Sequence, residues 1–453
     1  MILQETALIF WVAVSTVCSD GYHISELNFP QPSLTCQKDA SGPSTFAACL
    51  DITSTRYSII TAVLTVGGLL GSLAASNIIG RYGMFGTIWL TGAINLVGSI
   101  IMTISTHWIG LVLGRFVSGL SVGLAITTVA PLLSHTAITS PSAFFSTKRG
   151  LIGTLNQLGI VLGILSAQLV GLGATGMKGD KQGGWRWVVA VSGVVAIVQL
   201  GLGILLQPHI KKRNKKDSNE RSGGTGEHGE DTEAEPLLSP SGRKDAVRSS
   251  TISEILANPS IRPQVLLVAF ILAAQQLSGI NAVLFYSTPV LKPIIPDQAG
   301  LIGIGIAVLN ALMTFPPMFL VDRIGRIPIL LTSLGGMILS SILLAHGLNT
   351  HNQTLSAVSL LLFVASFAIG LGPIPFLLVS ELVPPEAVPA TSSIALSSSW
   401  VASFVVALGF LPLRDALGWV RRGVREGEGR VFWVFLGFQV GTAAVVIWKL
   451  YRR

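Results

Sequence analysis

Twelve long apolar runs restrict this chain more than any other feature. Each run approaches the roughly twenty residues that an α-helix needs to cross the hydrocarbon core of a bilayer. Strands of a membrane barrel would instead alternate apolar and polar side chains over about ten residues. The runs predict helices near residues 5–28, 56–79, 86–105, 108–133, 149–172, 185–207, 262–290, 299–321, 328–348, 355–381, 388–413 and 431–450.

The composition fits a chain that is surrounded by lipid. Of the 453 residues, 50% are hydrophobic and 11% are charged, whereas a soluble domain carries about 25% charged residues. Only helix bundles and closed barrels satisfy their backbone hydrogen bonds inside a bilayer. We therefore predict an all-α membrane protein with twelve transmembrane helices, whose partner is the lipid bilayer.

The net charge of +8 does not indicate nucleic-acid binding. Lys and Arg gather between Lys211 and Lys216 and in short loops, and the sequence shows no basic face with exposed stacking aromatics. Membrane proteins concentrate such residues on the cytoplasmic side. Their distribution predicts that both termini and the central segment are cytoplasmic.

The central segment, residues 208–261, divides the chain. It is polar, mixed in charge and rich in Gly and Ser, so we expect a largely disordered cytoplasmic loop. The flanking parts, 1–207 and 262–453, each contain six predicted helices. Two motif pairs recur at similar offsets across the loop: Arg81–Gly83 with Arg323–Gly325, and PLLSH with PFLLVSE. This repeat predicts two pseudo-symmetric six-helix bundles with a binding site near the midplane between them.

The strongest polar motif is QQLSGINAVLFYST in the seventh predicted helix. Gln275, Gln276 and Asn281 offer donors and acceptors without charge, which suits the hydroxyls of a neutral polyol. On a straight helix Gln275 and Asn281 would lie about 120° apart, but a break at Gly279 would turn both inward. The alternative is hydrogen bonding between helices, the default for a single buried amide. A cluster of three amides beside a glycine favours a binding site.

This stretch resembles the seventh helix of the sugar porter family in the major facilitator superfamily. Further segments resemble that family in the same order: Gly114–Leu124, Arg149–Leu165, Gly183–Trp187, Asp322–Arg326 and Gly372–Leu382. The resemblance covers nearly the whole chain except the central loop, residues 136–147 and the last loop. It implies a major facilitator fold and a secondary transporter, by uniport or proton symport, of a hexose or similar small neutral sugar.

The family implies which residues contact the sugar: Gln157, Gln275, Gln276, Asn281, Asn310, Phe376 and Trp400. For the two aromatic residues alone, packing toward lipid is an equally good interpretation. Ser399 and Ala368 stand where hexose carriers commonly have other polar residues. The resemblance therefore does not imply glucose itself.

The first helix carries an unusual set of titratable residues. Residues 21–31 are most similar to a fungal branch of the family that is linked to vacuolar protein sorting. Asp20, His23 and Glu26 are spaced three apart and so form one stripe of a helix. Proton-coupled relatives have an aspartate at the position of His23, facing the arginine that matches Arg115. Because histidine changes charge near neutral pH, His23 and Arg115 are proton-coupling candidates, with a structural polar patch as the alternative.

Charged residues at the cytoplasmic helix ends form a gate in this family. The matching residues retained here are Arg149, Asp322, Arg323, Arg326 and Glu381. Other gate positions have changed, including His135 in place of a glutamate and Val388 in place of an arginine. This weakened network leaves a second hypothesis open, a non-transporting sugar sensor or vacuolar trafficking factor on the same scaffold.

Short motifs outside the helices predict location and processing. Glu233 lies four residues before the pair Leu237 and Leu238, which fits an acidic dileucine signal for a sorting adaptor in the central loop. It favours the vacuolar membrane over the plasma membrane.

Three residues that the predicted topology places on the lumenal side are candidates for modification. Cys36 and Cys49 share a polar loop and are disulfide candidates if that loop is lumenal. Asn352 begins a glycosylation sequon. The sequence shows no metal cluster, phosphate-binding loop or nucleophile–base pair, so we expect no metal, no cofactor and no enzyme activity.

Overall fold

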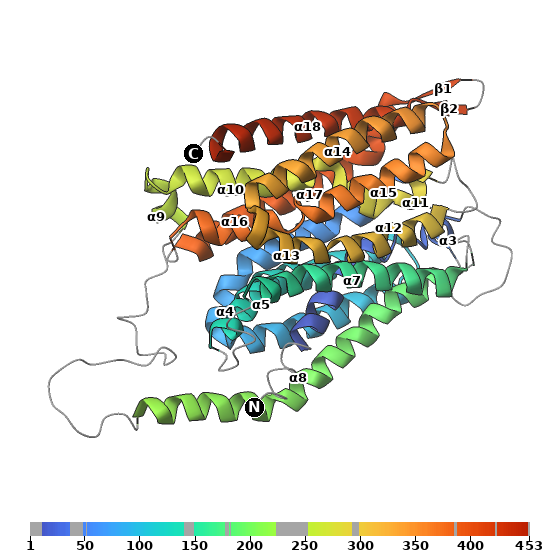
Figure 1. Ribbon diagram of the computed structural model, residues 1–453. Helices are drawn as coiled ribbons and strands as arrows, with labels where there is room; N and C mark the ends of the chain where they lie inside the picture. The colour runs from blue at the N-terminus through green and yellow to red at the C-terminus, as the bar shows by residue number, and fades with distance from the viewer. Residues whose placement is uncertain are drawn as a thin grey trace.

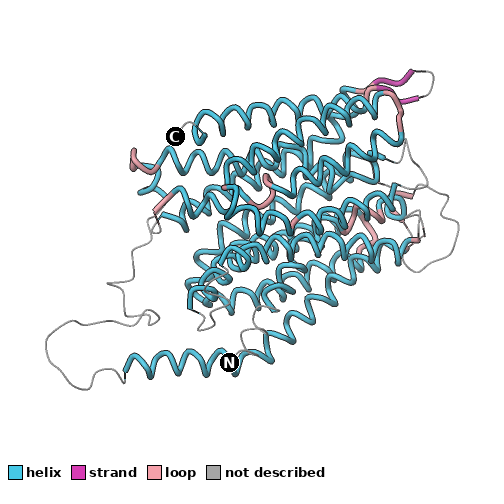
Figure 2. The backbone as a smooth tube through the Cα atoms, in the orientation of Figure 1, coloured by secondary structure: helices cyan, strands magenta, loops and turns pink. Residues whose placement is uncertain are grey.

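The computed structural model describes residues 11–36, 49–50, 52–139, 149–176, 181, 183–222, 252–291, 299–384, 387–421 and 424–451. In this part of the chain, helices dominate and a single two-stranded hairpin lies at one edge (Figure 2). The elements before the central segment are η1 (Val17–Gly21), α2 (Tyr22–Ser25), α3 (Gln31–Leu34), α4 (Ser54–Ile104), α5 (Trp108–Thr139), α7 (Arg149–Thr175) and α8 (Gly184–Ser222).

The elements after it are α9 (Ile252–Ala257), α10 (Arg262–Gln275), η2 (Gln276–Ile280), α11 (Asn281–Leu291), α12 (Ala299–Met313), α13 (Phe315–Ile324), α14 (Arg326–Asn349), α15 (Gln353–Ile369), α16 (Ile374–Leu382), α17 (Val388–Leu417), β1 (Trp419–Arg421), β2 (Val424–Glu426), η4 (Glu428–Arg430), α18 (Val431–Val446) and η5 (Ile447–Tyr451). Strands β1 and β2 pair antiparallel, with Val420 opposite Arg425.

Ten helical segments of the described chain are long and apolar enough to cross a membrane, and a shorter apolar helix spans Leu301–Pro317. These segments correspond to eleven of the twelve predicted runs. Two of them lie within α4, where Gly83 has a φ of 70° that separates Ser54–Ala75 from Arg81–Ile104. The first run begins outside the described residues and continues through η1 and α2. The chain is therefore an integral, multi-pass membrane protein with an all-helical fold.

The structure shows helix at both ends of the central segment, within the stretch that the sequence led us to expect as largely disordered. Helix α8 continues to Ser222, and residues 252–257 form α9. A helix that is already nucleated in the membrane extends at little cost through Lys, Arg and Glu, which are good helix formers. Pro208 lies inside this helix, and α8 changes direction along its length, as an internal proline would cause (Figure 1). Residues 223–251 lie outside the described part.

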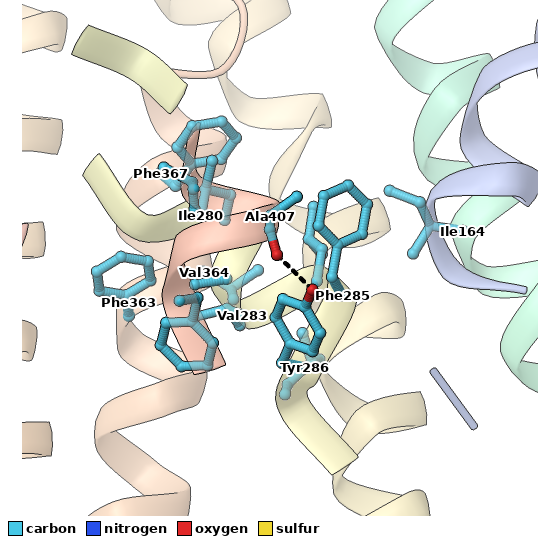
Figure 3. Packing of buried hydrophobic residues seen from close by; sticks show 14 of the residues in the cluster. Ile164, Ile280, Val283, Phe285, Tyr286, Phe363, Val364, Phe367 and Ala407 are labelled. Atoms are coloured by element: carbon cyan, nitrogen blue, oxygen red, sulfur yellow. Dashed lines mark hydrogen bonds between the residues drawn. The ribbon is translucent and has the colours of Figure 1, made fainter. Parts of the chain in front are cut away.

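The helices before and after the central segment pack against each other. Figure 1 shows the earlier, blue-to-green helices on one side and the later, yellow-to-red helices on the other. Contacts between α4 and α17 and between α7 and α12 join the two sets. Much of the core lies around α11, where Tyr286 donates a hydrogen bond of 2.5 Å to the carbonyl oxygen of Ala407 (Figure 3).

The bundle has two distinct ends. We call the end that carries α3 and the Cys36–Cys49 disulfide the disulfide end. The opposite end, which we call the Arg326 end, carries the ion pair between Arg326 and Glu381.

Candidate functional site

A cavity lies between the two sets of helices, with about 910 Å³ of space free of protein atoms, part of it open to solvent. It draws side chains from η1 and α2, from α4, α5 and α7, and from seven of the later helical elements. All seven residues predicted to contact a sugar line it: Gln157, Gln275, Gln276, Asn281, Asn310, Phe376 and Trp400. The structure thus brings together predicted contact residues that are up to 243 positions apart in the sequence, since Trp400 and Gln157 line the same cavity.

A break in the seventh membrane span aims its amides at the cavity. Gly279 has a φ of 97°, and Gln276–Ile280 form a π-helical turn. A glycine adopts this conformation readily because it has no Cβ. The backbone groups released at the break find side-chain partners, since Ser278 Oγ donates to the carbonyl oxygen of Gln275 at 2.6 Å and Gln439 Nε2 to that of Ser278 at 2.8 Å.

The three amides form one hydrogen-bonded chain. Asn281 Nδ2 donates to Gln276 Oε1 at 2.8 Å, and Gln276 Nε2 donates to Gln275 Oε1 at 3.2 Å. Gln275 Nε2 donates to the carbonyl oxygens of Leu371 and Gly372, at 2.6 and 2.9 Å. These bonds fix the side chains before any ligand arrives, which lowers the entropy cost of binding.

Two hydroxyls that the sequence did not single out as contacts complete this wall. Ser399 Oγ accepts from Gln276 Nε2, and Ser403 Oγ accepts from Asn281 Nδ2, both at 2.9 Å. Each hydroxyl accepts from an amide and keeps its own hydrogen to donate. On the neighbouring α12, Asn310 Oδ1 is buried without a hydrogen-bond partner among the described residues. The cavity therefore offers both hydroxyl donors and amide acceptors, the combination that pairs with a polyol.

The aromatic residues bridge and border the cavity. Trp400 Nε1 donates to Ser72 Oγ at 2.9 Å, which ties α17 to α4. The ring packs so closely on Gly68 that a Cβ there would lie 2.9 Å from it. Phe376 lines the cavity and is 37% exposed. Both aromatic side chains line the same cavity as the three amides.

Exposure along the cavity wall changes from one end to the other. Toward the disulfide end, Ile280, Leu284 and Phe285 are buried. Contacts between the two sets of helices seal this side, because Asn28 Nδ2 donates to the carbonyl oxygen of Leu284 at 3.1 Å and the rings of Tyr57 and Tyr286 meet at 6.1 Å.

Toward the Arg326 end the lining is more accessible. Gln157, Ile126 and Leu396 are partly exposed there, together with Phe376. The cavity therefore opens toward the Arg326 end.

The proton-coupling candidates lie in a buried charge cluster beside the cavity. Arg115 Nη1 donates to Glu26 Oε1 at 2.7 Å and to the backbone oxygen of His23 at 2.6 Å. His23 contacts Glu26 Oε1 through Nδ1 at 2.9 Å and Asn95 Oδ1 through Nε2 at 2.6 Å. Sequence comparison placed the His23 side chain opposite Arg115, but the carboxylate of Glu26 occupies that place.

Asp20, His23 and Glu26 do not act as one stripe. Asp20 lines the cavity, whereas His23 and Glu26 are 0% exposed and are not among the residues that line it. The π-helical turn η1 ends between Asp20 and His23, so the helical spacing of three does not hold there. The sequence identified these three residues, but it did not indicate that Asp20 lines the cavity while His23 and Glu26 are buried beside it.

The predicted gate is represented by one ion pair in the described residues. Arg326 Nε donates to Glu381 Oε1 at 2.8 Å, and both side chains are more than a third exposed. Arg323 is exposed. The side chains of Arg149 and Asp322 lie outside the described part, so their place in a gate stays a prediction.

The remaining candidates lie away from the cavity. Cys36 and Cys49 form a disulfide with a Cα–Cα distance of 5.1 Å. Asn352 is exposed and caps α15, with Oδ1 accepting from the backbone nitrogen of Leu355 at 2.9 Å. Glu233, Leu237 and Leu238 fall outside the described residues. Where the chain is described, no three His, Cys, Asp or Glu residues are grouped to hold a metal.

The fold is that of known sugar transporters. A crystal structure of a D-xylose–proton symporter matches with a TM-score of 0.71 and 19% identity, over 99% of this chain and 98% of that one. A partially occluded, inward-open xylose transporter from E. coli matches with a TM-score of 0.70 and 17% identity, over 98% and 99%. At these identities the likeness shows the fold alone.

Sequence relatives extend over nearly the whole chain. A probable metabolite transport protein of Saccharomyces cerevisiae is 29% identical over 421 residues, which cover 85% of this chain and 82% of that protein. Human facilitated glucose transporter member 14 is 31% identical over 468 residues, which cover 98% and 85%. A family profile described as "Sugar (and other) transporter" matches residues 8–452. The chain therefore belongs to the sugar porters of the major facilitator superfamily, a family of transporters and not of enzymes.

Proposed function

We propose that this protein is a secondary transporter that carries a hexose or similar neutral polyol through its central cavity by alternating access. The observation that carries this proposal is the convergence of the seven predicted contact residues on one cavity. Their polar groups are amides and hydroxyls, which pair with sugar hydroxyls without the desolvation cost of a charge. The likeness to facilitated glucose transporters supports a hexose.

The geometry supports an alternating mechanism. The cavity is closed at the disulfide end by Asn28, Leu284, Tyr57 and Tyr286, and it opens at the Arg326 end. Rocking the two bundles about this site would break the contacts at the disulfide end and close the opening at the Arg326 end. The pair Arg326–Glu381 lies where such a closure would occur.

Uptake by the purified full-length protein in liposomes tests the proposal. Labelled D-glucose, D-galactose, D-fructose, D-xylose and myo-inositol would each be offered against the same unlabelled sugar inside. We expect saturable counterflow of at least one of them, which Gln276→Ala reduces. If a sugar binds but none crosses, the scaffold is a sensor rather than a carrier.

We also propose the vacuolar membrane as its location, with the plasma membrane as the alternative. The acidic dileucine motif of Glu233, Leu237 and Leu238 and the similarity of residues 21–31 to a vacuolar-sorting branch support this. Changing both leucines to Ala should move a fluorescently tagged protein to an earlier compartment or the cell surface. An unchanged location would identify the motif as a chance match and would remove the reason to expect an adaptor.

A further inference from the structure

Asp20 is a carboxyl group in the wall of the cavity. It lies in η1, is 5% exposed and lines the cavity together with Gln157 and Gln276. No hydrogen bond or ion pair joins its carboxylate to another described residue. A charged side chain at membrane depth is rare and is normally paired, and those that occur mark ion or proton pathways.

None of the described charged residues around Asp20 forms an ion pair with it. Arg115 and Glu26 neutralise each other at 2.7 Å, and their side chains are 1% and 0% exposed. The described charged or titratable residues on the elements packed against η1 are Tyr22 and His23 on α2, Arg115 on α5, Arg56, Tyr57, Arg81 and Tyr82 on α4, and Arg186 on α8, with Glu26 directly after α2. Of these, Arg115, Glu26 and His23 lie in the cluster beside Asp20, and both Arg115 and His23 contact Glu26 there.

His23 is poorly placed to exchange protons with the cavity. Both of its ring nitrogens have partners, Glu26 Oε1 and Asn95 Oδ1, and its side chain is 0% exposed. A proton on this ring has no path to water that avoids breaking one of these contacts. Asp20, three residues earlier in the sequence, borders the cavity directly.

We propose that Asp20 is the residue at which the cavity takes up and releases one proton. A proton from cavity water binds a carboxylate oxygen of Asp20 and removes the unpaired charge. It returns to water when the cavity opens at the other end. The ion pair of Arg115 and Glu26 stays intact and holds the first helix in place. The coupling of this proton to transport rests on the proposed carrier function.

Carbodiimide labelling tests the proton site without any substrate. Dicyclohexylcarbodiimide adds to a protonated carboxyl within a membrane and leaves a stable acylurea, which peptide mass spectrometry locates. In the reconstituted full-length protein we expect the adduct on Asp20 and none on Glu26, with less adduct at alkaline pH. Asp20→Asn should lose this adduct, and Asp20→Glu should regain it at position 20. An adduct on Glu26 with none on Asp20 would overturn the proposal.

A transport measurement tests the coupling. For a sugar that shows counterflow, we measure the ratio of its concentration inside the vesicles to that outside under an inward-acid pH gradient. Counterflow in the same vesicles shows that the carrier itself is active. The concentration ratio should exceed one in the wild type and fall to one in Asp20→Asn. Asp415→Asn, a carboxyl change outside the cavity, should keep the wild-type ratio.

The two failures are distinguishable. A labelled Asp20 in a protein that moves no sugar would reject the proposed function and keep the proton site. Counterflow with a ratio that Asp20→Asn leaves unchanged would reject the coupling and keep the carrier.

Discussion

At the scale of single residues, Asn281 is the first donor of the hydrogen-bonded amide chain. Its two amide hydrogens bind Gln276 Oε1 and Ser403 Oγ, so Asn281→Ala removes a proposed sugar contact and releases Gln276. A lost hydrogen bond in a desolvated site costs about 1–3 kcal/mol, or about 5- to 150-fold in Kd. Equilibrium binding of the transported sugar measures this loss. Gln199→Ala, which removes a buried amide away from the cavity, should leave Kd within about twofold.

The second prediction at this scale concerns the buried pair of Arg115 and Glu26. Glu26→Gln leaves Arg115 charged in a site that is 1% exposed, which should lower the free energy of unfolding by about 3–5 kcal/mol. Adding Arg115→Met removes the stranded charge, so the double variant should be more stable than Glu26→Gln alone. Thermal unfolding in detergent ranks the stabilities of the wild type, the single variant and the double variant. A single variant as stable as the wild type would show that the pair does not hold the first helix.

Residue types were predictable here, but their pairings were not. A run of amides beside Gly279 stands out in one helix, because polar groups there need partners wherever the helix packs. The partner of Arg115 depends on which residue in or just after α2 faces α5, and the π-helical turn η1 changes the facing of these residues. The same turn places Asp20 on the cavity, which no regular helical period would indicate.

At the scale of elements, the break at Gly279 determines where the amides point. Its φ of 97° disfavours any Cβ, and a Cβ there would lie 2.7 Å from the ring of Phe435. We expect Gly279→Ala to cost about 1–3 kcal/mol from backbone strain, in addition to repacking of Phe435, and to reduce counterflow.

Gly335→Ala is the matched control, because nothing lies within 4 Å of a Cβ at that helical position. It should leave stability unchanged or slightly raised, since Ala favours a helix over Gly. Equal melting temperatures for the two variants would mean that the break is not a fixed feature.

The length of the apolar runs predicted the membrane spans well, but it did not predict the structure of the segments outside them. The runs matched eleven described spans because bilayer thickness sets helix length. The helical extension of α8 to Ser222 was missed, since polar composition alone does not distinguish a solvated helix from a disordered loop. The hairpin of β1 and β2 was missed for a similar reason, because three-residue strands carry no clear period.

At the scale of the whole molecule, the Cys36–Cys49 disulfide closes the loop before α4. If this end faces an oxidising compartment, both cysteines should be recovered as one linked peptide without reduction. Mass spectrometry after alkylation of free thiols tests this in the purified protein. Alkylated Cys36 and Cys49 would reject the bond and the lumenal placement of this loop.

The direction in which the cavity opens is the broadest prediction. Phe376 lines it near the Arg326 end and is 37% exposed, whereas Leu284 lines it near the disulfide end and is 8% exposed. In a Cys18→Ser background, Phe376→Cys should react with a membrane-impermeant thiol reagent added at the Arg326 end. Leu284→Cys should resist the same reagent added at the disulfide end. Phe363→Cys, at a buried position of 0% exposure outside the cavity lining, should resist it from both ends.

A saturating transported sugar should change this pattern if the bundles rock about the site. Labelling of Phe376→Cys should slow, because the sugar fills the cavity and favours closure at the Arg326 end. Labelling of Leu284→Cys by reagent added at the disulfide end should become faster than without sugar, because the contacts of Asn28 and Tyr57 separate. Mass spectrometry of time points in oriented vesicles measures both rates. Reaction at Leu284→Cys from the disulfide end without sugar would show that the resting protein opens the other way.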